Sequence, residues 1–283
     1  MLRQKWGSVV CPGCNMLVGV QDERCFHCGR WNPGMWGFAP MLTRFGRDMG
    51  FVPLVTTSCI VLYVITLFAD RRRGGGGLLN LLSPTFNSLW LFGASGYYPV
   101  LLDGRWWTVL TASWLHANLI HIALNMMAVR NVAPIVSEFY GASRMIIIYV
   151  VGGVTGFAVS TFVGAYLTFL PSFLAGASYT VGASASISGL IGAVFYYGHR
   201  TGSRGVSDQA RLWILSFLVM GFLFPGIDNW AHFGGLAGGY VCSKVLDPLY
   251  PERLDHFVIA VISLILSALA IVVSVIHAFL PTA

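Results

Sequence analysis

Residues 182–193 read Gly-Ala-Ser-Ala-Ser-Ile-Ser-Gly-Leu-Ile-Gly-Ala, a run of small residues that opens a longer apolar stretch. Glycine, alanine and serine at this density let two helices approach closely inside a membrane. A single serine in such a stretch most often bonds its own backbone, so Ser184 alone carries little meaning. Its interpretation depends on the sequence around it.

Composition places the whole chain in a bilayer. Of its 283 residues, 56% are hydrophobic and only 10% are charged, which leaves too few polar side chains to cover a soluble globule. The mean hydropathy of +0.71 agrees with this. About 20 helical residues cross the hydrocarbon of a membrane. We therefore predict an all-α polytopic membrane protein with spans at 51–69, 107–129, 143–166, 181–198, 210–227, 229–246 and 255–280.

The distribution of positive charge predicts the orientation. The chain opens with polar, cysteine-containing sequence and its first apolar run begins at Phe51, so we expect this run to stay in the membrane and no signal peptide to be removed. If the N-terminus is cytoplasmic, the outer face holds few of the 17 Lys and Arg residues, namely Arg71, Arg72, Arg73 and Arg105. The positive-inside rule favours that topology, and we expect a prokaryotic inner membrane. The net charge of +6 suits anionic lipid headgroups, and no basic stretch with interleaved aromatic residues indicates nucleic acid.

The N-terminal tail carries two Cys-x-x-Cys pairs, Cys11 with Cys14 and Cys25 with Cys28. Each pair can direct two thiolates at one ion, and four sulfur atoms at about 2.3 Å complete a tetrahedral structural zinc site. The alternatives are a disulfide pair or a redox-active motif, but a cytoplasmic location disfavours stable disulfides. We predict a zinc ribbon at about residues 9–33, in which Zn²⁺ supplies much of the folding energy.

The segment from Asp70 to Arg105 is expected outside the membrane. It begins with Arg71–Arg73 and Gly74–Gly77, and its later part, 89–98, is aromatic and apolar but too interrupted to cross a bilayer. Such a stretch suits the outer interface. Its Gly-Ala-Ser-Gly sequence lies in a loop, where no helix would hold a nucleophile.

Polar groups at bilayer depth are costly and therefore indicate function. Three of the predicted spans contain them and run from outside to inside, so these side chains gather in the outer half of the membrane. They are His116, His121 and Asn125 in the second span, Ser184 in the fourth and His232 in the sixth.

These residue types match the needs of a serine nucleophile. A serine hydroxyl attacks a peptide bond only when an imidazole accepts its proton and donors stabilise the oxyanion. Ser184 and His232 fit the first two roles. His121 and Asn125 are four residues apart, on one face of a helix, and could donate to the same oxygen.

Close approach of the fourth and sixth spans requires small residues at spacings of three or four. The fourth span has Gly189 and Gly192, and the sixth has Gly235 and Gly239. His232 lies on the same helical face as Gly235 and Gly239. The predicted base therefore shares its face with the glycines that admit the neighbouring helix.

From about Trp106 to Gly239 the chain resembles the rhomboid intramembrane serine proteases. The family's His-x4-His-x3-Asn pattern, its nucleophile helix and its Ala-His-x-Gly-Gly base motif are all matched, at 116–125, 182–193 and 231–235. The resemblance implies a Ser-His dyad without an acid and without a catalytic cofactor. It also implies cleavage of transmembrane substrates near their outer end, with His121 and Asn125 as oxyanion groups and His116 as a supporting residue.

Three positions depart from the family pattern. Ala185 replaces a glycine after the nucleophile, and Ser188 replaces an aromatic residue that often packs on the histidine. Arg105 precedes the Trp106-Trp107 pair, whereas the family often has arginine after the tryptophan. Asp228 lies four residues before His232, and we predict it to be a helix N-cap and not a triad acid.

We predict a cytoplasmic tail at 1–50, a six-helix rhomboid-like core at 51–250 and a seventh membrane helix within 251–283. The predicted activity is a serine endopeptidase acting on single-span or polytopic membrane proteins, and the zinc ribbon could recruit a cytoplasmic partner. The main alternative is a proteolytically inactive rhomboid-like protein that binds membrane clients, which Ala185 and Ser188 motivate. A transporter is disfavoured because the chain shows no carboxylate at bilayer depth and no paired, broken helices.

Overall fold

The computed structural model describes residues 3–14, 16–43, 46, 48–69, 82–171, 174–224 and 226–279. The Arg71–Arg73 cluster and the Gly74–Gly77 run, expected to open the external segment, lie outside these residues.

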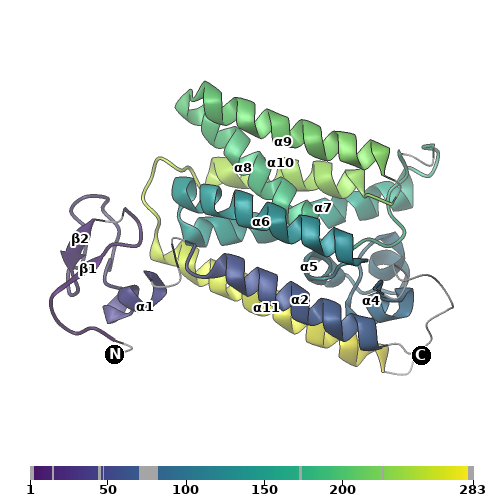
Figure 1. Cartoon of the computed structure of the whole chain (residues 1–283), viewed down its shortest axis with the longest axis horizontal. Helices are drawn as coiled ribbons and strands as arrows, with labels where there is room; N and C mark the ends of the chain where they lie inside the picture. The colour runs from purple at the N-terminus through teal and green to yellow at the C-terminus, as the bar shows by residue number, and fades with distance from the viewer. Residues whose placement is uncertain are drawn as a thin grey trace.

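Helices dominate the described chain (Figure 1). A small N-terminal module contains the antiparallel strands β1 and β2, with Ser8 opposite Gly19 and Val10 opposite Leu17. Short helical turns η1, η2 and η3 lie at Met35–Gly37, Tyr98–Leu102 and Ala112–Trp114. The remaining bounds are β1 Ser8–Val10, β2 Leu17–Gly19, α1 Ala39–Thr43, α2 Phe51–Ala69, α4 Phe86–Phe92, α5 Thr108–Thr111, α6 Leu119–Tyr140, α7 Ala142–Tyr166, α8 Ser184–Thr201, α9 Arg204–Leu223, α10 Asn229–Val245 and α11 Leu254–Ala278.

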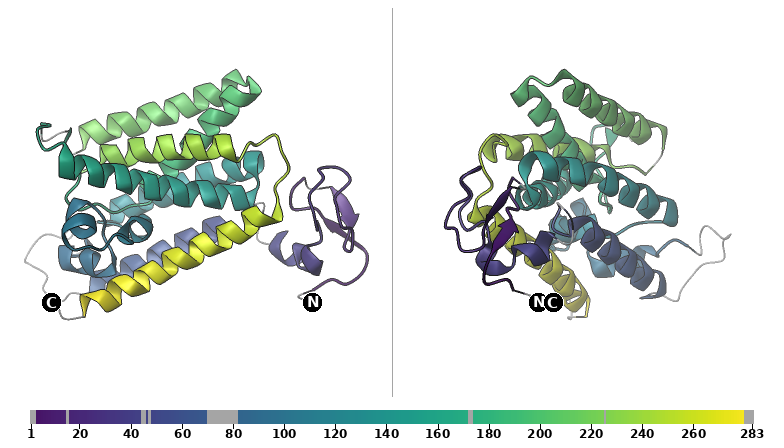
Figure 2. Two further views of the ribbon diagram at one scale, coloured as in Figure 1. Left: turned by 180° about the vertical axis from the view of Figure 1, so that it is seen from behind. Right: turned by 60° about the vertical axis from the view of Figure 1, so that its left-hand side comes forward.

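The prediction of an all-α polytopic membrane protein is confirmed. Within the described residues, α2, α6, α7, α9 and α11 are long and apolar enough to cross a membrane. The shorter α8 and α10, of 18 and 17 residues, pack closely on each other and on α7. α9 lies at the outside of the bundle, where most of its surface is exposed (Figures 1 and 2).

The predicted span 107–129 is wrong in its bounds. The chain from Trp107 to Trp114 forms the short elements α5 and η3, Leu115 is extended, and α6 begins only at Leu119. The Asn118 side chain accepts a hydrogen bond from the His121 N–H at 2.8 Å and caps the new helix. His116 therefore precedes the helix that carries His121 and Asn125, whereas we expected all three on one span.

The start of the predicted span 210–227 is also wrong. α9 begins six residues earlier, at Arg204, because its first turns are polar but still helical. Asp208 and Arg211 form an exposed ion pair there, with 2.8 Å between Oδ1 and Nη1. A hydropathy pattern does not detect such turns, since they extend the helix beyond its apolar part.

The backbones of α8 and α10 are in close contact, and glycines permit it. A Cβ on Gly239 would lie 2.0 Å from the Gly189 carbonyl oxygen, and a Cβ on Gly235 would lie 2.2 Å from the Ala185 carbonyl oxygen. A Cβ on Gly192 would likewise lie 2.3 Å from the Leu236 carbonyl oxygen. The predicted packing role of these glycines is confirmed.

Hydrogen bonds join α11 to the segment that precedes α6. The fully buried Arg105 donates to the carbonyl oxygens of Trp90 at 2.8 Å and Ser274 at 3.2 Å. The Trp107 indole N–H donates to the Ser274 hydroxyl at 3.0 Å. Arg105 thus joins α4 to α11.

The N-terminal module lies at one end of the long helices (Figures 1 and 2) and is joined to them through Glu252. One carboxylate oxygen of Glu252 pairs with Arg30 at 2.6 Å, and both side chains are almost fully buried. The other oxygen accepts from the backbone N–H groups of Ser143 at 2.7 Å and Arg144 at 3.2 Å. A single carboxylate therefore links the module, the α6–α7 turn and the loop between α10 and α11.

Glu252→Ala should lower stability strongly. The substitution leaves the Arg30 guanidinium buried without its partner, and we expect a loss of about 3–5 kcal/mol, read as a lower Tm in detergent. Asp208→Ala is the matched control, because the Asp208 and Arg211 side chains are 63% and 65% exposed and such pairs contribute at most about 1 kcal/mol. Equal Tm values for the two variants would contradict this importance of Glu252.

Candidate functional site

The beginnings of α6, α8 and α10 meet at the end of the bundle away from the N-terminal module. His121 and Asn125 lie in the first two turns of α6, Ser184 is the first residue of α8, and His232 lies in the first turn of α10. These four predicted residues therefore stand near the starts of their helices.

Gly182 brings the α6 and α8 groups together. Its φ of +131° is a conformation that side chains other than glycine rarely adopt, and a Cβ there would lie 2.6 Å from Nε2 of His121 and 3.7 Å from Nδ2 of Asn125. Its N–H donates to the Ala112 carbonyl oxygen at 2.9 Å. The turn that ends at Ser184 is thus held directly against the His121 and Asn125 side chains.

The Ala185 side chain packs where α8 meets α7 and α10. Its side chain is fully buried, and a Cβ on Gly156 of α7 would lie 2.9 Å from the Ala185 methyl group. It forms a small apolar cluster with Ala112, Phe157 and Ala231. The extra methyl group, relative to glycine, is accommodated where α8 meets α7 and α10.

His232 is held by its helix cap and by an aromatic ring. The Asp228 side chain accepts from the Ala231 N–H at 3.0 Å, so its predicted role as an N-cap is confirmed. The second Asp228 oxygen accepts from the Ser160 hydroxyl at 2.6 Å. The Phe217 ring, from α9, lies 5.2 Å from the His232 ring at 64°.

Ser184 and His232 stand on helices in direct contact, since the Ala185 carbonyl meets Gly235, three residues after His232. In the part of the chain that the structure describes, no hydrogen bond joins the Ser184 and His232 side chains. His116 is fully buried, and its ring packs edge-on against His121 with 5.2 Å between centroids. His116 thus reaches the site from the segment before α6.

Two contacts could not be predicted from the sequence: that of Phe217 with His232 and that of Glu252 with Arg30. Phe217 lies in an apolar run like many other aromatic residues, and nothing in its spacing indicates contact with a histidine. Glu252 follows Pro251 in a short polar stretch between two apolar runs. A carboxylate at that position could have indicated a partner on another segment, although not which one.

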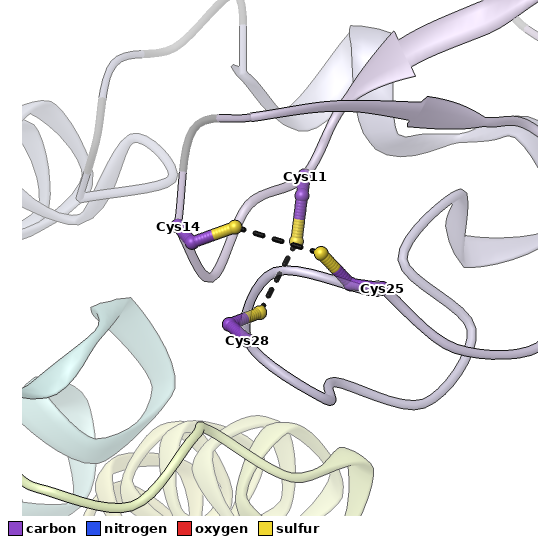
Figure 3. Close-up of side chains that lie close together, drawn as sticks. All are labelled: Cys11, Cys14, Cys25 and Cys28. Atoms are coloured by element: carbon purple, nitrogen blue, oxygen red, sulfur yellow. Dashed lines mark hydrogen bonds between the residues drawn. The ribbon is translucent and has the colours of Figure 1, made fainter.

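The four predicted cysteine ligands converge in the N-terminal module (Figure 3). Their sulfur atoms lie within 4.8 Å of one another, with 3.8 Å between Cys11 and Cys28 and 3.6 Å between Cys14 and Cys25. A tetrahedron with metal–sulfur bonds of about 2.3 Å has edges of about 3.8 Å. The cluster therefore fits a single metal ion with four thiolate ligands.

The thiols of this cluster differ in acidity. Burial raises the pKa of Cys11 and of Cys28. Burial also acts to raise the pKa of Cys25, but hydrogen bonds from the backbone N–H groups of Cys28 and His27 and from the Cys14 and Cys28 thiols together outweigh it and lower the pKa of that thiol to about 7. A metal ion that binds four thiolates must displace the protons from the thiols of raised pKa, so acid should weaken binding.

Comparison with known proteins agrees with the geometry. A family model described as the Rhomboid domain matches residues 103–249. The chain is 30% identical over 197 residues to the rhomboid protease GluP of Bacillus subtilis, covering 69% of this chain and 35% of that protein. It is 33% identical over 171 residues to RHOMBOID-like protein 7 of Arabidopsis thaliana, covering 59% and 51%, respectively. The putative rhomboid protease YdcA of Bacillus subtilis is 29% identical over 160 residues, covering 55% and 74%.

The first two of these relatives are matched over only about a third to a half of their own length. The match includes the segments that contain His116, His121, Asn125, Ser184 and His232, since all five fall within residues 103–249.

Cys25→Ser should remove the metal from purified protein. We expect about one metal ion per chain in the native form and close to none in the variant, measured by elemental analysis. Native protein should also lose its metal as the pH falls from about 8 to about 5, because protons compete for the thiolates. Cys59→Ser is the control, since Cys59 is buried in α2 away from the cluster. A native protein free of metal at neutral pH would contradict the assignment.

Proposed function

The chain belongs to the rhomboid family, and from that premise we propose that it is an intramembrane serine protease that uses Ser184 as nucleophile and His232 as base. The observation that carries the proposal is the convergence of the starts of α6, α8 and α10. Ser184, His232, His121 and Asn125 come from these three helices to one end of the bundle.

The proposed reaction follows the chemistry of serine proteases. His232 accepts the proton of the Ser184 hydroxyl as its oxygen attacks the substrate carbonyl, and then gives that proton to the leaving amine. A water molecule, deprotonated by His232, hydrolyses the acyl-enzyme. No metal ion or other cofactor takes part in these steps.

The developing oxyanion has three proposed donors. The Ser184 backbone N–H stands at the start of α8, where it has no helical acceptor and where the helix dipole favours negative charge. The side chains of His121 and Asn125 lie beside Gly182, two residues before the nucleophile. Donors in place before the reaction stabilise the transition state without reorganisation.

We propose substrates that are single-span or polytopic membrane proteins, cut near the membrane face away from the N-terminal module. With a cytoplasmic N-terminus in a prokaryotic inner membrane, this is the outer face. The proposed division is a tail at 1–50, a rhomboid core at 51–250 and a further membrane helix within 251–283, which corresponds to α11.

We propose Zn²⁺ as the metal of the cysteine cluster, because four thiolates in a tetrahedron are its usual structural ligands. The role is structural, since such a site leaves no position open for a substrate. The module is attached to the end of the bundle away from the proposed catalytic residues, and its exposed surface could bind a cytoplasmic partner.

A second candidate function is the binding of membrane clients without proteolysis. The lack of a hydrogen bond between the Ser184 and His232 side chains in the described part of the chain, and the departures at Ala185 and Ser188, favour it. Against it, both dyad residues are retained and the Ala185 methyl group is accommodated in the helix contact.

Ser184→Ala should abolish cleavage. We expect a fall of at least about 10³-fold in the cleavage of a single-span reporter helix in liposomes, because the nucleophile is lost while the fold remains. Ser216→Ala, on the exposed face of α9, is the matched control and should cleave like the native protein. A fluorophosphonate should label the native protein and not Ser184→Ala. Full cleavage by Ser184→Ala would refute the dyad, and a native protein that neither cleaves nor reacts would favour client binding.

A further inference from the structure

Three large aromatic side chains are exposed close together on the N-terminal module. Trp31, Trp36 and Phe38 are 45%, 54% and 40% exposed, respectively. Single exposed aromatic residues are common on proteins, but a group of them on so small a module indicates a surface that contacts a membrane or another protein.

Contacts join these side chains to Arg3 and Arg24. The Trp31 and Trp36 rings lie edge to face, with 5.9 Å between their centroids. Cζ of Arg3 lies 5.8 Å from the centroid of the Phe38 ring, and Nε of Arg3 donates to the Trp36 carbonyl oxygen at 2.8 Å. Arg24 and Trp31 are partners in an antiparallel bridge, which places their side chains next to each other on one face. We call these five residues the aromatic–basic surface.

The charge beside the rings is positive. Arg3 and Arg24 are exposed. Glu23 is exposed as well, but successive side chains of an extended segment point to opposite faces, so Glu23 points away from the side of Arg24. The Asp22 carboxylate is engaged elsewhere, since it accepts from the Gly19 N–H at 2.7 Å. The surface therefore presents two guanidinium groups next to three aromatic rings.

The backbone holds Trp36 outward in an unfavourable conformation. Met35 and Trp36, in η1, have φ values of +48° and +54°, which bulky residues rarely adopt. Met35 is buried in the core of the module, whereas Trp36 is exposed. Strained backbone of this kind is found at functional sites, so it is consistent with a use for the exposed ring.

The module lies beside the starts of two helices that face lipid (Figures 1 and 2). Phe257, in the first turn of α11, packs against the core of the module, and that core includes Ala39, the residue after Phe38. Only 28% of the apolar span of α2 and 22% of that of α11 is buried within the protein, so lipid surrounds most of both helices. The aromatic–basic surface therefore lies close to the lipid headgroups around these helix ends.

We propose that the aromatic–basic surface binds the anionic lipid headgroups of the membrane that contains the bundle. Tryptophan favours the boundary between headgroups and hydrocarbon, and phenylalanine is common on the apolar face of surface-bound segments. Arg3 and Arg24 then pair with lipid phosphate groups. The inference concerns the module alone and does not depend on the proposed proteolytic activity.

The test uses the full chain labelled with 5-fluorotryptophan, in nanodiscs of phosphatidylcholine with and without added phosphatidylglycerol. The ¹⁹F signals of Trp31 and Trp36 are assigned by their loss in Trp31→Phe and Trp36→Phe. We expect a water-soluble gadolinium chelate to broaden both signals in neutral discs and much less in anionic discs. Added salt should restore the broadening, because it screens charges at a lipid surface.

Arg24→Gln should weaken the protection of Trp36. One positive charge near an anionic membrane contributes about 1 kcal/mol, so the ratio of bound to free surface should fall about fivefold. Arg211→Gln is the matched control, because Arg211 is 65% exposed on α9, across the bundle from the module (Figures 1 and 2), and should leave Trp36 protected. Unchanged ¹⁹F shifts in detergent show that each variant keeps the fold of the module.

Three results would overturn the proposal. The first is equal broadening of Trp36 in neutral and anionic discs. The second is protection that appears only after a cytosolic extract is added, which identifies a protein partner as the occupant. The third is an equal loss of protection in Arg24→Gln and Arg211→Gln, which shows an effect of net charge and no contact at this surface. None of these measurements involves proteolysis, so their failure leaves the proposed function unaffected.

Discussion

The arrangement of the bundle depends on direct backbone contact between α8 and α10. Helices in lipid gain little from the hydrophobic effect, since lipid tails are as apolar as their side chains, so close packing must supply the attraction. Gly189, Gly235 and Gly239 remove the side chains that would keep the two backbones apart. The contact begins at Ala185, next to Ser184, and at Gly235, one turn after His232. The packing that stabilises the bundle therefore also sets the distance between the two proposed reacting groups.

The long helices could be predicted from sequence because the bilayer requires about 20 apolar residues for each crossing. The helix Phe51–Ala69 agrees with its prediction at both ends. Prediction failed where a local hydrogen bond determines the start of a helix. The Asn118 side chain caps α6, so this helix begins well inside an apolar run. The four cysteines were predictable because metal ligands recur at fixed spacing. Phe217 and Glu252 were not, because their partners lie on segments far away in the sequence and no local pattern records such contacts.

Glu252 gives the N-terminal module a defined place on the bundle. A buried carboxylate needs partners for both oxygens, and Arg30 supplies one while the start of α7 supplies the others. Arg144 in turn donates to the carbonyl oxygens of Leu246, Asp247 and Tyr250, at the end of α10 and beyond. Arg30 lies two residues after Cys28, so the fold of the cysteine cluster positions the guanidinium that Glu252 requires. A metal ion bound by the four cysteines would therefore also stabilise the attachment of the module to the bundle.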